Sequence, residues 1–255
     1  MASAQSCLIY IMICIEVLGL LAIILIGVWL GQYGDNNGFG LNTYKGLLNL
    51  HSLIMPMGAV FFPANGIVLY RAFRRYAARK VKWAHFVFQL IAFLLVIVGF
   101  TFAIMARSKL IDDFKNQNQA PDNPKAENGD RKHFYSVHSW LGLMCFIIFV
   151  LQFLGGLFAF AFKVVDKSAR ELFAAIHAFF GIFIVLLGGF VAVVGIEGRA
   201  KTDIPNYDKI VDAGILANVA ALAIVIMLAH VLYISVNPFF EWDVNDETLE
   251  ANPIE

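Results

Sequence analysis

Long apolar runs separated by short polar connections dominate this chain of 255 residues. Six such runs lie at about residues 7–31, 46–70, 83–106, 136–162, 172–197 and 212–236. Crossing the hydrocarbon core of a bilayer takes about 20 apolar residues in a helix, and every run reaches that length. None alternates between apolar and polar positions as a barrel strand does. The pattern therefore predicts an all-α membrane protein with six transmembrane helices, forming a single domain over residues 1–255.

Composition supports this interpretation. Hydrophobic residues make up 60% of the chain and charged residues only 15%, against about a quarter charged residues in soluble domains. The formal net charge is zero, so no nucleic-acid partner is expected. The first run is longer than a signal-peptide core and follows no basic stretch, so it is expected to be a retained helix. Cys7, Cys14 and Cys145 all lie inside apolar runs, and neither a disulfide framework nor a thiolate metal site is expected.

The distribution of Lys and Arg predicts the orientation of the helices. The second and fourth connections together hold nine of the 19 basic residues, namely Arg71, Arg74, Arg75, Arg79, Lys80, Lys82, Lys163, Lys167 and Arg170. Short basic loops stay on the cytoplasmic side of a membrane. Both termini are then also cytoplasmic, and the first, third and fifth connections face the lumen or the outside. The third connection, about residues 107–135, is the longest and is polar.

Four of the six histidines lie inside the apolar runs at matching depths. His51 and His138 lie near the lumenal starts of the second and fourth runs, whereas His85 and His177 lie near the cytoplasmic starts of the third and fifth. With a rise of about 1.5 Å per residue, the two levels are roughly 15–20 Å apart in a core about 30 Å thick. The depths therefore pair His51 with His138 and His85 with His177.

Ionisable residues inside membrane helices are costly and usually functional. Two imidazoles from facing helices can hold a flat cofactor in a bundle core, and bis-histidine haem favours electron transfer over oxygen chemistry. The four histidines are thus candidate axial ligands of two haem irons. Zinc and copper are disfavoured because no third or fourth ligand lies at either depth. The 24 phenylalanines, several of which flank the histidines, would suit a large apolar macrocycle.

Two other functions remain open at this point. A haem-free transporter could use intramembrane histidines as a proton relay, but such relays usually include buried acids, and only Glu16 lies clearly inside a run. A structural membrane protein would not need paired histidines. His230 and Glu16 are expected to have structural hydrogen-bond partners. His133 contacts a haem propionate or a substrate, or is solvated.

Three stretches resemble the signatures of the cytochrome b561 family over nearly the whole chain. Residues 65–74 (NGIVLYRAFR), followed by Arg79, Lys82 and His85, resemble its cytoplasmic signature. Residues 135–142 (YSVHSWLG) resemble its lumenal signature, and residues 214–219 (GILANV) its sixth-helix segment. The resemblance implies a transmembrane ascorbate-dependent oxidoreductase with two haem b groups, usually a homodimer. Cytosolic ascorbate would give single electrons that reduce monodehydroascorbate or a ferric chelate on the lumenal side.

The resemblance also implies roles for individual residues. The haem ligands are the two histidine pairs, and further haem contacts fall on Arg71, Tyr135, Ser136 and His133. Ascorbate contacts fall on Lys82, Arg170, Arg71 and Lys80. A second lysine of the family's cytoplasmic site falls on Ala78, with Arg79 and Lys80 beside it. Secretory vesicle, endosome or lysosome, and plasma membrane are all compatible locations.

Cations in the two cytoplasmic connections suit this donor without reference to the family. Ascorbate is a monoanion at neutral pH, and clustered cations attract and orient an anionic ligand. The same cations could instead only set the topology or contact anionic lipid. For Lys82 and Arg170, each one or two turns from a predicted ligand, the sequence favours the substrate site.

Overall fold

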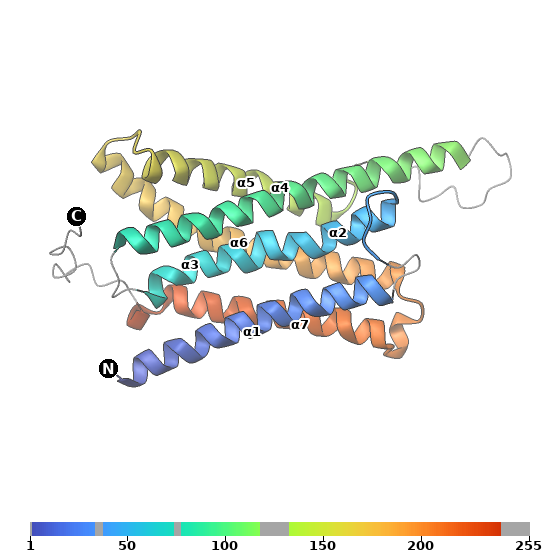
Figure 1. Ribbon diagram of the computed structural model, residues 1–255, viewed down its shortest axis with the longest axis horizontal. Coiled ribbons are helices and arrows are strands. Elements are labelled where there is room, and N and C mark those ends of the chain that lie inside the picture. The colour runs from blue at the N-terminus through green and yellow to red at the C-terminus, as the bar shows by residue number, and fades with distance from the viewer. Residues whose placement is uncertain (1, 34–37, 74–77, 118–132, 241–255) are drawn as a thin grey trace.

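A computed structural model describes residues 2–33, 38–73, 78–117 and 133–240. In these residues the chain forms a bundle of long helices that run along its longest axis (Figure 1). The helices are α1 (Ala2–Gln32), α2 (Tyr44–Pro56), α3 (Phe62–Ala72), α4 (Ala78–Gln117), α5 (Val137–Gly156), α6 (Lys167–Asp203) and α7 (Asp212–Val236). Two π-helical segments, η1 (Met57–Phe61) and η2 (Leu157–Ala161), extend α2 and α5, and two short 3-10 turns, η3 (Tyr207–Lys209) and η4 (Pro238–Phe240), flank α7.

Six helical spans are long and apolar enough to cross a membrane, and α2, η1 and α3 together form one of them. The prediction of six membrane-spanning helices is confirmed, and the chain is an integral multi-pass membrane protein. The start of α1 and the end of α7 lie at the same end of the bundle, together with the starts of α4 and α6 (Figure 1). Which end faces the cytoplasm stays a prediction from the loop charges.

The helices extend beyond the predicted apolar runs, most clearly at the third connection. Residues 107–135 were expected to be a polar loop, yet α4 continues to Gln117. Leu110, Ile111 and Phe114 prolong its apolar positions, and the first proline comes only at Pro121. The expected second and fourth connections are shortened in the same way, because Arg79, Lys80 and Lys82 lie in the first turns of α4, and Lys167 and Arg170 in the first turn of α6.

The π-helical segments are a feature that the apolar pattern does not predict. In η1 the Phe62 amide donates to the Met57 carbonyl five residues earlier, immediately after Pro56. Proline has no amide hydrogen, so the regular ladder is already broken there. The wider turn lies tightly against its neighbours. A Cβ added at Gly58 would lie 2.9 Å from the Val96 nitrogen of α4, and one at Gly188 of α6 would lie 2.8 Å from the Ala59 carbonyl oxygen.

Substitution of Gly188 tests this contact. Gly188→Val places a branched side chain against the Ala59 carbonyl, and overpacking of this kind costs about 1–3 kcal/mol. We expect a lower midpoint of unfolding for the detergent-solubilised protein, measured by thermal or denaturant titration. Gly198→Val is the control on the same helix, because a Cβ at Gly198 meets nothing within 4 Å. Equal midpoints for the two variants would refute the contact.

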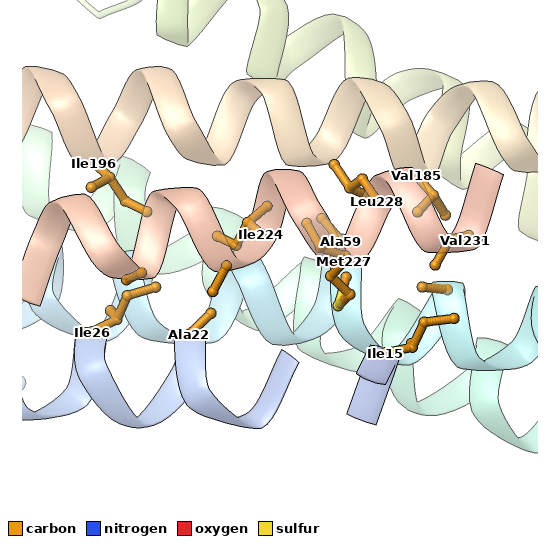
Figure 2. Close-up of a cluster of buried hydrophobic side chains, with 14 of the residues drawn as sticks. Ile15, Ala22, Ile26, Ala59, Val185, Ile196, Ile224, Met227, Leu228 and Val231 are labelled. Carbon is orange, nitrogen blue, oxygen red and sulfur yellow. The ribbon is translucent and has the colours of Figure 1, made fainter. Parts of the chain in front are cut away.

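The buried core joins α1, α7, α6 and η1 (Figure 2). Figure 2 shows Ile15, Ala22 and Ile26 of α1 facing α7, with Ala59 of η1 and Val185 of α6 completing the cluster. Lipid tails are as apolar as these side chains, so the hydrophobic effect does not drive helices together inside a membrane. Van der Waals contact between closely approaching helices does so instead, and small residues at the interface permit that approach. Alanines on α7 meet this need, since Ala217 and Ala220 are fully buried. The pair α1–α7 thus covers one side of the remaining spans.

Stacked phenylalanines join α4 to α5 on the other side. The rings of Phe93 and Phe153 lie 4.3 Å apart with a 14° angle between their planes. The rings of Phe100 and Phe146 lie 4.1 Å apart with a 13° angle. Both helices contribute residues seven positions apart, which returns them to the same face of a helix. These offset stacks close the four-helix core made by α2–α3, α4, α5 and α6.

Candidate functional site

His51 of α2 and His138 of α5 form the first histidine pair. Their ring centres lie 6.2 Å apart, and the ring planes are inclined by 86°. The His51 Nδ1 donates to the Gly99 carbonyl of α4 at 2.9 Å, and the His138 Nδ1 donates to the Val191 carbonyl of α6 at 3.0 Å. A carbonyl only accepts, so both Nδ1 atoms carry the proton and both Nε2 atoms keep a free electron pair.

His85 of α4 and His177 of α6 form the second pair. Their ring centres lie 6.4 Å apart, with an interplanar angle of 70°. The His85 Nδ1 donates to the Gly66 carbonyl of α3 at 2.8 Å. The His177 Nδ1 is buried and has no hydrogen-bond partner among the described residues. The main chain of His177 is held instead, because the Gln152 Nε2 of α5 donates to its carbonyl at 2.5 Å.

The same four spans build both pairs at two levels of the bundle. On α4, Gly99 follows His85 by 14 positions, and on α6, Val191 follows His177 by 14 positions. At about 1.5 Å per residue, this spacing separates the two levels by about 21 Å along the helix axes. The structure therefore brings together the pairs that the depths along the sequence predicted.

The spacing within each pair matches bis-histidine ligation of one iron. Imidazole–metal bonds of about 2.0–2.1 Å, plus about 1.1 Å from each nitrogen to its ring centre, place the two centres about 6.3 Å apart. The observed separations are 6.2 and 6.4 Å. Two axial nitrogens are what a porphyrin-bound iron requires. Nowhere in residues 2–33, 38–73, 78–117 or 133–240 do three His, Cys, Asp or Glu residues gather as a protein-only metal site would need.

Glycines let two of the paired histidine rings approach neighbouring helices closely. A Cβ at Gly156 of α5 would lie 2.8 Å from the His177 Cε1. A Cβ at Gly195 of α6 would lie 2.7 Å from the His138 Cε1. Any larger residue at either position would displace the ring. Sequence reasoning does not single out Gly195, because glycines are common in membrane helices.

The sequence of this chain matches a known protein family over the segment that contains both histidine pairs. The sequence model of eukaryotic cytochrome b561 matches residues 50–201, which include all four paired histidines. This chain belongs to the cytochrome b561 family. Membership of this family implies haem b, and the paired histidines of this cytochrome b561 fit that group.

Several relatives of this cytochrome b561 are ascorbate-dependent reductases by name. The transmembrane ascorbate-dependent reductase of Sus scrofa is 31% identical over 221 residues, which cover 86% of this chain and 79% of the relative. The lysosomal membrane ascorbate-dependent ferrireductase of Bos taurus is 26% identical over 223 residues, covering 85% and 76%. A putative transmembrane ascorbate-dependent reductase of Caenorhabditis elegans is 28% identical over 191 residues, covering 74% and 67%.

Predicted substrate residues of this cytochrome b561 lie at the end of the bundle where α4 and α6 begin (Figure 1). Lys80 and Lys82 are exposed in the first turns of α4. Arg170 lies in the first turn of α6 and donates to the Val165 carbonyl at 2.8 Å. Arg74 and Arg75 and the side chain of Ala78 lie outside the described part. The contacts of these residues with ascorbate stay predictions.

Arg71 is a predicted contact that the structure half-buries. It lies near the end of α3, five positions after Gly66, whose carbonyl holds His85. The Arg71 Nη2 donates to the Ser235 carbonyl of α7 at 2.7 Å. Its Nη1 is buried and has no hydrogen-bond partner in the described chain. A half-buried cation with a spare buried donor atom near this pair suits an anionic group such as a propionate.

The predicted haem contacts at the opposite end surround the start of α5. Ser136 caps α5, and its Oγ accepts from the Ser139 amide at 3.2 Å. This hydroxyl therefore has a structural task that sequence reasoning did not assign to it. The Arg107 guanidinium lies over the Tyr135 ring, 5.3 Å from its centre. The His133 ring lies beside Phe134, whose φ is 57°. Contacts of these residues with haem stay predictions.

A polar network beside His51 was missed by sequence reasoning. Arg199 of α6 forms an ion pair with Asp203 at 2.7 Å. It also donates to the Ser52 Oγ at 3.1 Å and to the Asn49 Oδ1 at 2.8 Å, both on α2. The network borders a small cavity of about 60 Å³. Arg199 was placed in a polar connection because it follows the fifth apolar run, and only the longer α6 brings it back to α2.

Glu16 and His230 have structural partners, as expected. The Asn65 side chain hydrogen-bonds to the Glu16 carboxyl group. The His230 Nδ1 donates to the Ile226 carbonyl of its own helix at 2.7 Å. Neither residue belongs to the two histidine pairs.

Proposed function

We propose that this cytochrome b561 transfers single electrons across the membrane from cytosolic ascorbate to an acceptor on the lumenal or extracellular side, through two bis-histidine b haems. The observation that carries the proposal is the presence of two histidine pairs with ring centres 6.2 and 6.4 Å apart. Both separations suit one iron between two Nε2 atoms. The two levels, about 21 Å apart, extend across most of the hydrocarbon core.

His51 and His138 would hold one haem, and His85 and His177 the other. Haem, when bound, would supply a one-electron Fe(III)/Fe(II) couple, and ligation by both histidines of a pair would leave no site for oxygen. The carbonyls of Gly99, Gly66 and Val191 keep three of the rings in the tautomer that presents Nε2. The protein thus favours electron transfer over oxygen activation.

Cations at the start of α4 and α6 support ascorbate as the donor. Lys80 and Lys82 are exposed, and Arg170 and Arg71 lie at the same end of the bundle. They would attract the ascorbate monoanion and orient it toward the His85–His177 level. Ascorbate loses one electron and one proton there and becomes monodehydroascorbate. The names of the relatives support this choice of donor.

The acceptor is monodehydroascorbate or a ferric chelate on the opposite side. The second choice is supported by the ferrireductase name of the relative from Bos taurus. Assays with each acceptor on the side facing the third connection distinguish the two. We also propose a homodimer, which light scattering of the purified protein would test. The location is a secretory vesicle, an endosome or lysosome, or the plasma membrane.

An absorption spectrum of the purified protein tests the function as a whole. We expect a Soret band that corresponds to two haems per chain and shifts on addition of ascorbate. Absence of the band, or a band that neither ascorbate nor dithionite changes, would contradict the proposal. A Soret band that responds to dithionite but not to ascorbate would refute ascorbate as the electron donor, whereas the proposal of bound haem would stand.

Lys82→Ala tests the donor site. We expect reduction by ascorbate to slow by about tenfold, because a hydrogen bond to a charged group contributes about 1.5–3 kcal/mol. Stopped-flow absorbance gives the rate, and the pyridine haemochrome assay should show unchanged haem content. Lys167→Ala is the matched control, since Lys167 is exposed and lies 4.0 Å from Glu171. An unchanged rate in Lys82→Ala would mean that this cation only orients the protein.

A further inference from the structure

Three of the four paired histidines are anchored by one kind of hydrogen bond. The Nδ1 atoms of His51, His85 and His138 donate to main-chain carbonyls at 2.9, 2.8 and 3.0 Å. In each case the acceptor belongs to a neighbouring span. Such a bond fixes the orientation of a ligand ring and raises the basicity of its metal-binding nitrogen.

The acceptors also share a register on their helices. Gly99 follows His85 by 14 positions and Val191 follows His177 by 14 positions. Gly66 follows His51 by 15 positions, on the span that contains the π-helical segment η1. A π-helical turn accommodates one extra residue, so the three acceptors occupy equivalent places.

His177 breaks this pattern at the equivalent place on α5. The residue 14 positions after His138 is Gln152, and it meets His177 in a different way. Its side-chain Nε2 donates to the main-chain carbonyl of His177 at 2.5 Å. The His177 Nδ1, although buried, has no partner within the described ranges of the chain. A buried donor without an acceptor is unusual enough to require an explanation.

Two glycines make this arrangement possible. A Cβ at Gly181 would lie 3.4 Å from the Gln152 Nε2, so Gly181 leaves room for the amide beside the His177 carbonyl. Gly156 receives the ring itself, with its Cβ position 2.8 Å from the His177 Cε1. Main-chain hydrogen bonding and packing therefore place His177, whereas the other three ligands are placed by their Nδ1 atoms.

We propose that Gln152 is the positioning residue of His177, and that it leaves Nδ1 without an acceptor so that the haem held by His85 and His177 is easier to reduce than it would be with an anchored ligand. A less basic imidazole stabilises Fe(III) less, which raises the reduction potential. The inference rests on the proposed function, since it assumes haem at this pair. It assigns control of the reduction potential of that haem to Gln152, a residue that would not bind the iron.

Gln152→Glu tests the inference by supplying the missing acceptor. An ionised carboxylate cannot donate to the His177 carbonyl, and we expect it to accept from the Nδ1 hydrogen instead. We expect the oxidised-to-reduced ratio of one haem at fixed ambient potential to rise about tenfold, which corresponds to about 59 mV for a one-electron couple. A spectroelectrochemical titration measures this ratio for both haems. The affected haem is identified as the one that is lost in His85→Ala.

Gln89→Glu is the matched control for a buried charge. Gln89 of α4 also donates to a carbonyl, that of Pro63 at 3.3 Å, and it lies beside Gly66. The neighbouring His85 Nδ1 already has an acceptor, so the new carboxylate gains no ring hydrogen there. We expect a clearly smaller shift. Equal shifts in the two variants would overturn the inference, as would a shift confined to the other haem.

Gln152→Leu provides a second test that does not add charge. Loss of the bond to the His177 carbonyl frees the ring, and we expect the electron paramagnetic resonance g values of the same ferric haem to change while haem content is kept. Unchanged g values together with an unchanged potential in Gln152→Glu would refute the positioning role. Failure of the proposed function is distinguishable, because the unsubstituted protein would then show no redox-active Soret band.

Discussion

Replacing His85 by alanine is expected to remove one of two haems and to abolish reduction of the protein by ascorbate. The substitution deletes the histidine paired with His177, whose ring centre lies 6.4 Å from that of His177. It leaves the His51–His138 pair about 21 Å along the bundle intact. The haem content measured by the pyridine haemochrome assay should fall from two to about one per chain, and the rate of absorbance change with ascorbate should fall to background.

His177→Ala should give the same result, because both ligands belong to one pair. His230→Ala is the matched control, since His230 is also an intramembrane histidine and its Nδ1 donates to a carbonyl of its own helix. It should keep both haems and the full rate. Retention of two haems in His85→Ala or His177→Ala would refute the pairing.

Replacing His138 by alanine should separate the two halves of the reaction. The substitution removes one ligand of the pair with His51, whose ring centre lies 6.2 Å away. The His85–His177 pair near the cations remains, so ascorbate should still reduce about half of the haem absorbance. Electron delivery to an acceptor enclosed in vesicles should fall to background, because the level on that side lacks its cofactor.

The measurement uses proteoliposomes with ferricyanide inside and ascorbate outside. The orientation of the protein in the vesicles is checked by testing which connections an external protease cleaves. Acceptor reduction at the normal rate in His138→Ala would contradict the two-step path. Loss of reduction by ascorbate in the same variant would contradict the assignment of the donor side to His85 and His177.

Most of the architecture could be predicted from the sequence because a bilayer leaves few choices. Hydrocarbon offers no hydrogen-bond partners, so an apolar run of sufficient length must be a helix. The six runs, the charge of the connections and the depths of four histidines follow from one-dimensional patterns. The helix ends were predicted less well, as α4 shows by continuing to Gln117. The thickness of the bilayer fixes the length of a helix only inside the membrane, so it does not set where a helix ends in water.

Only the tertiary structure decided how the paired histidine rings are held. Every residue has a carbonyl group, so nothing in the sequence distinguishes Gly99 or Val191 as the acceptor of a particular imidazole. Helix rotation, the π-helical segments and contacts such as Gly188 with Ala59 select them. Arg199 meets Ser52 across 147 positions of the chain for the same reason.

The sequence by itself thus determined the number of spans, the family and the histidines that share a depth. The structure decided that the members of each pair lie at the spacing of one iron, and that His177 alone is held through its main chain by Gln152. The physical reason is that depth in a membrane follows from position along a helix at a constant rise per residue. Direction around a helix and distance between helices depend on packing between all of them.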